Sequence, residues 1–176
     1  MTNYSKTINL PKTNFSMKAN LSEKETQWLE FWHKNKIYDN LKQKNKKNIK
    51  YVLHDGPPYA NGDLHLGHAL NKILKDVICR FKFQSAMNVE YVPGWDCHGL
   101  PIEWKVEEQF RKSGKKKSEV NLQTFREECR QFAKKWVNIQ RDQFNRFGIQ
   151  TDWEDIYLTM NKNCLLYTSD AADEDL

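Results

Sequence analysis

The sequence is poor in the residues that would predict a disulfide-stapled, metal-bound or membrane-spanning protein. It has four cysteines, and no two of them form a C-x-x-C pair, the spacing that zinc modules and thiol redox sites use. No apolar run approaches the ~20 residues that cross a bilayer, and residues 1–6 lack the apolar segment of a secretory signal. We therefore expect reduced thiols, no membrane association and a cytoplasmic location.

Charge of one sign is not in large excess either. Twenty-eight basic and 23 acidic residues give a net charge of +5, a balance compatible with an RNA partner and equally with an ordinary soluble protein. The basic residues are densest in residues 42–50 and 112–117, which we expect as solvated loops, with contact to RNA phosphates as the alternative. Aromatic residues make up 12% of the chain and include six tryptophans, so the composition excludes disorder and predicts a buried core.

The first 50 residues predict an extended leader, one helix and a loop. Residues 1–21 are mostly polar, and three apolar side chains are candidates for anchoring this leader: Leu10, Phe15 and Met17. Ser22 and Glu25 match the capping box that opens a helix. We expect that helix to run to about Tyr38.

Residues 51–92 carry the pattern strand, helix, strand. Residues 51–54 form a short apolar run that ends at Asp-Gly-Pro-Pro, where prolines cannot continue a sheet ladder. Six apolar residues then recur at the spacing of an amphipathic helix: Leu70, Ile73, Leu74, Val77, Ile78 and Phe81. A second short strand is expected at residues 88–92. This order predicts the parallel crossover unit of an α/β fold.

Two further helices are predicted in the second half of the chain. Pro101 is well placed in the first turn of a helix through about Phe110, because its fixed φ suits that position. Thr124 and Glu127 form another capping box, and Gly148 is placed to stop the helix that they open. One face of this helix is apolar and is expected to pack on the sheet: Phe125, Cys129, Phe132, Trp136 and Ile139.

The string His65-Leu66-Gly67-His68 stands at the entry of the long helix. A helix amino terminus attracts phosphate through its free N–H groups and its dipole, and two imidazoles three residues apart can both donate to a phosphate as charge builds on it. Gly67 removes a side chain between them, so that a flat base can approach. Two alternatives remain open: a pair of surface histidines beside an ordinary turn, or a metal site formed with Cys97 and His98.

A second glycine-containing turn, residues 94–101, directly follows the second strand. Ligands of open α/β sheets bind at the carboxyl ends of the strands, so this turn and the loop before His65 are expected to face one crevice. Asp96 is then a candidate to hold a cationic group such as a substrate ammonium. The alternative is that Asp96 only caps the turn before the next helix. No serine–histidine–acid arrangement and no paired-carboxylate motif stands out.

Two strings of the sequence resemble the class I aminoacyl-tRNA synthetases. Residues 58–68, Pro-Tyr-Ala-Asn-Gly-Asp-Leu-His-Leu-Gly-His, resemble the HIGH signature of that family. Residues 54–62, His-Asp-Gly-Pro-Pro-Tyr-Ala-Asn-Gly, followed by residues 94–103, Gly-Trp-Asp-Cys-His-Gly-Leu-Pro-Ile-Glu, resemble its isoleucine-specific branch more than the leucine, valine or methionine branches. The leader and residues 152–160 fit as well, so the resemblance extends over about residues 4–161.

The resemblance implies a fold and a reaction. The fold is the first half of a Rossmann-type, parallel-sheet catalytic domain with an amino-terminal helical extension. In the reaction, isoleucine attacks the α-phosphate of ATP, which is used with Mg²⁺, and gives isoleucyl-adenylate and pyrophosphate. The aminoacyl group then moves to the 3′-terminal ribose of tRNA(Ile). The partners implied are thus isoleucine, ATP and tRNA(Ile), in a full-length protein that is expected to be monomeric.

The resemblance also implies roles for residues that match the motifs. His65 and His68 are the catalytic pair that stabilises the phosphates during adenylate formation. The residues implied in ATP binding are Pro58, Tyr59, Asn61, Gly62, His65, Gly67 and His68. Gly56 and Asp96 are expected to hold the amino group of isoleucine, and Pro57 to wall its side-chain pocket. No metal ligand is expected within this chain.

The sequence departs from the family pattern toward its carboxyl end. It contains no KMSKS loop, editing domain or anticodon-binding domain, and a zinc site is expected only in a carboxyl-terminal part that is not present. We therefore expect three segments: residues 1–48 as the extension and helix, residues 49–163 as the first half of the catalytic domain, and residues 164–176 as a non-native tail. The chain alone is expected to be marginally folded and inactive in aminoacylation.

Two other functions are weighed against this one. A free-standing nucleotidyl transferase shares the H-x-G-H chemistry, but the string at residues 94–103 disfavours it. A non-catalytic RNA-binding module is supported only by the two lysine-rich stretches, and it predicts tRNA binding that depends steeply on salt and not on ATP or isoleucine.

Overall fold

A computed structural model describes residues 4, 7–9, 13–14, 18–115 and 117–165 of the chain. Leu10, Phe15 and Met17, the proposed anchors of the leader, lie outside the described residues, and so do residues 166–176 of the proposed tail. None of the helices in the described ranges is long and apolar enough to cross a bilayer.

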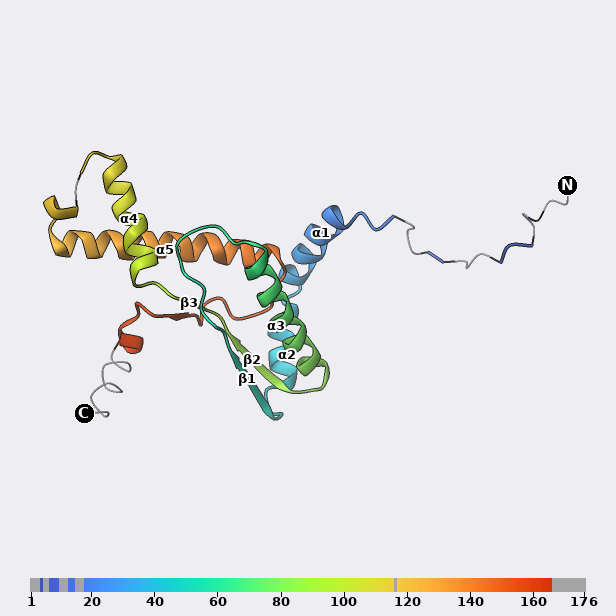
Figure 1. The fold of residues 1–176 in the computed structure, drawn as a ribbon. Helices are drawn as coiled ribbons and strands as arrows, with labels where there is room; N and C mark the ends of the chain where they lie inside the picture. Colours follow the sequence, from blue (N-terminus) through green and yellow to red (C-terminus); the bar gives the residue numbers. More distant parts are fainter. Residues whose placement is uncertain (1–3, 5–6, 10–12, 15–17, 116, 166–176) are drawn as a thin grey trace.

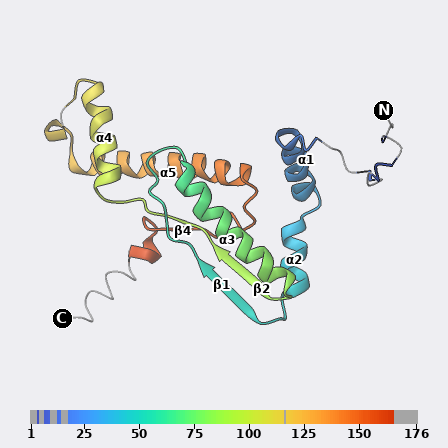
Figure 2. The same ribbon diagram turned by 45° about the vertical axis from the view of Figure 1, so that its right-hand side comes forward.

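The centre of the fold is a parallel strand pair joined by a helical crossover, as the sequence predicts. Strand β1 (Lys50–His54) pairs with β2 (Asn88–Val92) in parallel, and helix α3 (Leu66–Gln84) connects them. Figure 2 shows α3 lying along β2, with which it packs. On β2 the side chains of Val89 and Tyr91 are buried, because alternate residues of a strand point to one face. The α/β class is thus confirmed.

Two helices, not one, precede the strand pair. Helix α1 (Leu21–Lys34) and helix α2 (Ile37–Asn45) are separated by Lys36, whose φ of 49° breaks the helical path. The predicted single helix to Tyr38 is therefore wrong, and so is the Ser22 capping box, because α1 begins after Asn20.

Helix α2 occupies part of the lysine-rich stretch that was expected to be a loop. Its last residue, Asn45, is buried, and the side-chain amide donates to the carbonyl oxygens of Phe83 and Met87, at 3.1 and 3.0 Å. These carbonyls stand at the carboxyl end of α3 and in the turn before β2. Asn45 therefore closes α2 onto the crossover, a long-range contact that local composition does not encode.

The second half of the chain contains helix α4 (Leu100–Lys112), a short 3₁₀ turn (Lys117–Glu119, η2) and helix α5 (Leu122–Arg146). Helix α4 begins directly after Gly99, so Pro101 lies in its first turn, as predicted. The predicted Thr124 capping box is wrong, because the Asn121 side chain caps α5 by accepting from the Gln123 N–H at 2.8 Å. Gly148 follows the end of α5 with a φ of +79°, a conformation that glycine adopts without strain.

A second, smaller parallel pair adjoins these helices. Strand β3 (Gly94–Trp95) pairs with β4 (Tyr157–Leu158), in the register Gly94 to Tyr157 and Trp95 to Leu158. Figure 1 shows α4 and α5 to one side of the β1–β2 pair, and β3 lies between this pair and the two helices. The chain after β2 thus passes directly from the central sheet into the α4–α5 region.

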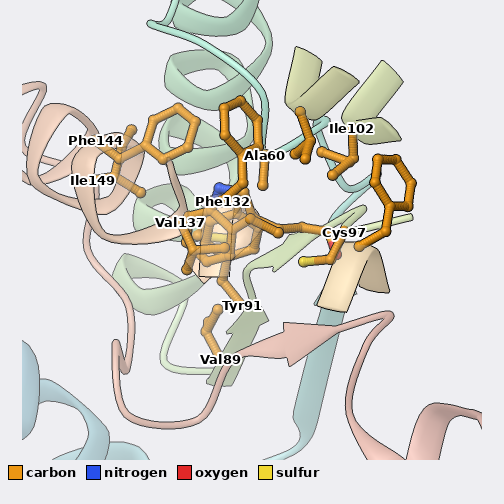
Figure 3. Packing of buried hydrophobic residues seen from close by; sticks show 14 of the residues in the cluster. Ala60, Val89, Tyr91, Cys97, Ile102, Phe132, Val137, Phe144 and Ile149 are labelled. Atoms are coloured by element: carbon orange, nitrogen blue, oxygen red, sulfur yellow. The ribbon is translucent and has the colours of Figure 1, made fainter. Parts of the chain in front are cut away.

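The core lies where α5 meets β2, β3 and α4. Figure 3 shows its side chains converging from these elements, with Phe132, Val137 and Phe144 on α5 and Val89 and Tyr91 on β2. The predicted α5 face is partly correct: Phe125 and Phe132 are buried, whereas Cys129, Trp136 and Ile139 are half-buried. The other buried positions of α5 are Ala133, Val137, Gln140 and Phe144.

Helix α3 presents its apolar stripe away from this core. The six residues that predict the helix are all exposed: Leu70, Ile73, Leu74, Val77, Ile78 and Phe81. Its buried residues are Lys72, Asp76, Cys79 and Phe83. The periodicity located the helix correctly, but the buried face carries a lysine and an aspartate.

Candidate functional site

The two segments singled out in the sequence are joined by backbone hydrogen bonds. The Asp96 N–H donates to the Pro58 carbonyl oxygen at 2.8 Å, and the Ala60 N–H donates to the Asp96 carbonyl oxygen at 3.0 Å. Tyr59 and Asp96 thus form a parallel bridge beyond the ends of β1 and β2. Because the strands are parallel neighbours, their carboxyl ends deliver both segments to the same edge of the sheet.

His65 and His68 cap the amino terminus of α3 with each other. His65 is the residue before the helix, and its Nδ1 accepts from the Gly67 N–H at 3.1 Å. In return, the His65 N–H donates to Nδ1 of His68 at 3.3 Å. The two ring centroids lie 3.8 Å apart. The helix-terminal N–H of Gly67, which sequence reasoning left free for a phosphate, is therefore used within the cap.

This capping fixes the tautomer of both rings. A nitrogen that accepts from a backbone N–H carries no proton, so the proton of each neutral imidazole resides on Nε2. Each ring therefore has one N–H donor left, on the side away from its cap. His65 is exposed and His68 half-buried, so the pair can offer two such donors to an anion in front of the helix.

His68 is held in its neutral form by its surroundings. Burial, and then the neighbouring His65, lower the pKa of His68 below its ordinary value of 6.5. A lowered pKa agrees with the cap, because protonation at Nδ1 would replace an acceptor with a donor that faces the His65 N–H.

We expect a pH titration of the chain, followed by the histidine NMR signals, to give His68 a pKa below 6.5. Because the unfolded chain then binds this proton more readily than the folded one, the stability that the cap contributes is present above the ordinary pKa and is lost as pH falls through the folded-state pKa. A pKa for His68 at or above 6.5 would contradict this account.

Gly67 makes room for the first ring of the pair. A β-carbon at this position would lie 3.0 Å from Cε1 and 3.1 Å from Nδ1 of His65, closer than the ~3.5–4.0 Å of an optimal carbon contact. The missing side chain therefore permits the His65 ring to fold back over the helix terminus. In sequence reasoning this space was assigned to an approaching base.

Asp96 uses one carboxylate oxygen within the chain. Oδ1 accepts from the His98 N–H at 3.2 Å and from the Thr159 hydroxyl at 3.3 Å, while the same hydroxyl oxygen accepts from the Cys97 N–H at 2.9 Å. The capping role considered for Asp96 is thus present. Among the described residues no hydrogen bond or ion pair engages Oδ2 of this half-buried side chain, so a ligand cation can still be bound there.

The base of the first segment is tied to α3 by buried ions. Asp55, 2% exposed, forms ion pairs with Lys72 and, at 2.6 Å, with Lys75. Burial, and then the charge of Lys75, lower the pKa of Lys72 to about 7. Asp55 immediately precedes Gly56 and Pro57. The ion pairs could not be predicted from the sequence, because a lysine on a helix is normally solvated.

Helix α5 supplies two further residues that the sequence analysis did not identify. Gln140, 1% exposed, and Gln143 bind residues 59–64, the loop that leads to His65. The sequence offered one indication of this role: Gln140 lies three residues after Val137 and four before Phe144, on the face of α5 that the structure buries.

The remaining predicted site residues surround these contacts. Gly56, Pro57 and Tyr59 are exposed, and Pro58, Asn61 and Gly62 are half-buried. Among the described residues no three histidine, cysteine or carboxylate side chains are grouped to hold a metal ion. Burial raises the pKa of the Cys97 thiol to about 11, so this thiol is protonated at neutral pH.

Comparisons with known proteins relate the chain to one group. A family model described as tRNA synthetases class I (I, L, M and V) matches residues 27–170. The chain is 56% identical over 158 residues to the isoleucine–tRNA ligase of Ruegeria pomeroyi and 57% identical over 154 residues to that of Pelagibacter ubique. These alignments cover 90% and 88% of the chain and 16% and 17% of the relatives, so the chain spans about one sixth of their length.

A solved structure resembles the fold. It is a ternary complex of the LeuRS of Agrobacterium radiobacter K84 with tRNA and LeuAMS, and it superposes with a TM-score of 0.64 over 90% of this chain and 18% of that one. The sequence identity is 20%, so this likeness concerns the fold alone.

Proposed function

The chain belongs to the class I tRNA synthetases of the isoleucine, leucine, methionine and valine group, and we propose that it forms the part of an isoleucine–tRNA ligase that binds isoleucine and ATP. The observation that carries the proposal is the backbone pairing of Tyr59 with Asp96. This pairing joins the loop that ends at the imidazole pair to the turn that holds the carboxylate. In this assignment residues 49–163 are the first half of the catalytic domain, and residues 1–48 its extension.

In the proposed reaction the carboxylate of isoleucine attacks the α-phosphate of ATP and displaces pyrophosphate. Negative charge builds on the phosphate oxygens as the bond to the leaving group stretches. The Nε2–H groups of His65 and His68 donate to these oxygens, and their prior orientation by the cap avoids reorganisation during the reaction. ATP enters as its Mg²⁺ complex.

Isoleucine is held by the second segment and the start of the first. Oδ2 of Asp96 accepts from the substrate ammonium in a charge-assisted hydrogen bond. Gly56 leaves the backbone open to the same group, and Pro57 walls the apolar pocket. The loop residues Pro58, Tyr59, Asn61 and Gly62, with Gly67, line the nucleotide side of the site. The adenylate then passes its aminoacyl group to tRNA(Ile), the third partner.

The proposal is tested by ATP–pyrophosphate exchange with the complete ligase that carries this chain. We expect exchange that depends on isoleucine and that is at least tenfold slower with leucine or methionine at equal concentration, since a branched pocket rejects a side chain of another shape by about 1–3 kcal/mol. The control omits the amino acid. Exchange that does not depend on an added amino acid would support the alternative hypothesis of a free-standing nucleotidyl transferase.

A further inference from the structure

Two glutamines on one face of α5 bind residues 59–64, the loop that leads to His65. Gln140 and Gln143 are three residues apart, so their side chains project from the same side of the helix. Their partners lie about eighty positions earlier in the sequence, in residues 59–64. The helix that forms much of the core thus reaches the loop directly.

Gln140 satisfies three groups at once. Its Oε1 accepts from Nε1 of Trp95 at 2.9 Å, and its Nε2 donates to the carbonyl oxygens of Tyr59 and Gly62 at 3.0 and 2.7 Å. Trp95 is fully buried and precedes Asp96 in the chain. Only a side chain with one acceptor and two donors fits these partners, which is the inventory of a primary amide.

Gln143 holds the end of the same loop. Its Oε1 accepts from the Leu64 N–H at 3.0 Å, and its Nε2 donates to Oδ1 of Asp63 at 2.8 Å. Leu64 directly precedes His65, whose own N–H donates to His68. Gln143 therefore fixes the backbone immediately before the imidazole cap.

We propose that Gln140 and Gln143 are positioning residues that set the imidazole pair relative to the Asp96 carboxylate. Gln140 ties the Trp95 side of the site to the start of the loop, and Gln143 ties the end of the loop to the cap. Neither side chain touches a reacting atom; both act through the backbone that carries the groups that do. The inference rests on the proposed function, because it assigns these contacts to the same active site.

The test compares Gln143→Met with Gln131→Met in the complete ligase. Gln131 is an exposed glutamine of α5 that contacts Glu127, so it controls for the loss of an amide on the same helix. Loss of two hydrogen bonds at the loop, one of them to the Asp63 carboxylate, is expected to lower kcat of isoleucine-dependent exchange about tenfold. The KM for isoleucine is expected to stay within about twofold, because Asp96 keeps its own contacts. The control variant is expected to match the parent enzyme.

A swap of hydrogen-bond roles separates positioning from general stability. Gln143→Glu alone sets a second carboxylate against Asp63 and is expected to lower kcat at least as far as Gln143→Met. Adding Asp63→Asn lets the new amide donate to the new carboxylate, and kcat is expected to return to within about threefold of the parent. Gln140→Met removes three hydrogen bonds and is expected to lower kcat further. If Gln140→Met does not fold, the variants at Gln143 and Asp63 decide the matter.

The outcomes distinguish the two proposals. Absence of isoleucine-dependent exchange in the parent enzyme overturns the proposed function. An active parent with Gln143→Met at the parental kcat overturns the positioning role alone. A fall in kcat that follows the melting temperature and is not rescued by the swap also overturns it, because the contacts then serve only stability.

Discussion

Replacing His68 with alanine in the complete ligase is expected to lower the rate of isoleucine-dependent ATP–pyrophosphate exchange by about 10²- to 10³-fold, the loss seen when one preorganised donor to a developing charge is removed. The reason is geometric. Nδ1 of His68 is engaged by the His65 N–H, so its one remaining donor, Nε2–H, is directed by the cap and needs no reorganisation in the transition state.

The loss of a donor must be separated from the loss of a cap. His68→Gln is the matched variant, because glutamine at this third helical position can accept from the His65 N–H in an ordinary capping box. Its amide keeps N–H donors, but on a flexible side chain that does not fix them where Nε2–H of His68 lies. We expect His68→Gln to retain the parental melting temperature within a few degrees and still to lose at least about 10²-fold in rate. His33→Gln on the exposed face of α1 is the control, and a rate within threefold of the parent for His68→Gln would refute the donor role.

Replacing Asp55 with asparagine is expected to destabilise the chain by about 3–5 kcal/mol, the usual result of removing one partner of a buried ion pair. The substitution keeps the shape of the side chain but leaves Lys72, 3% exposed, and Lys75 without a counter-charge. The measurement is the free energy of unfolding in urea. Glu90→Gln is the control, because the Lys50–Glu90 pair lies at the surface and is worth less than about 1 kcal/mol.

The same variant has a predicted pH dependence. The pKa of Lys72 is already lowered from 10.5 to about 7 by burial and by Lys75, and removal of the carboxylate lowers it further. The unfolded chain then binds more protons than the folded chain between that pKa and 10.5, so stability rises with pH across this range. The parent has the same slope above about pH 7, because its own Lys72 has a pKa of about 7 when folded. The destabilisation of Asp55→Asn relative to the parent should therefore shrink as pH rises toward about 7 and stay constant above it; a destabilisation that grows over the same range would contradict the assignment.

The elements that the sequence predicted correctly are those specified locally. Helix α3 and strands β1 and β2 follow from periodicity and from the proline-containing turn, and their parallel order follows from chain connectivity. The errors arose where signals compete. Helices α1 and α5 begin after Asn20 and Asn121, two and three positions before the predicted capping residues Ser22 and Thr124. Helix α2 extends into a lysine-rich stretch because Asn45 makes hydrogen bonds to residues 38 and 42 positions away.

The candidate site divides in the same way. The family predicted from residues 54–62 and 94–103 is confirmed by the comparisons. It could be predicted because each of these strings is contiguous in the sequence. The supporting residues were missed, because burial of Lys72 or Gln140 depends on which face of a helix packs inward. On α3 the apolar stripe is exposed, so hydrophobic periodicity located the helix but did not identify which of its residues are buried. Lysines and glutamines at helical spacing are ordinarily solvated, and only tertiary structure distinguishes these.

The most direct test of the account is a crystal structure of the complete ligase with a non-hydrolysable isoleucyl-adenylate analogue. We predict that Oδ2 of Asp96 binds the ammonium of the analogue within hydrogen-bond distance, and that Nε2 of His65 and His68 faces the group that replaces the phosphate. An ammonium bound away from Asp96, or imidazoles turned away from that group, would contradict the central claim that the two segments joined at Tyr59 and Asp96 form one site.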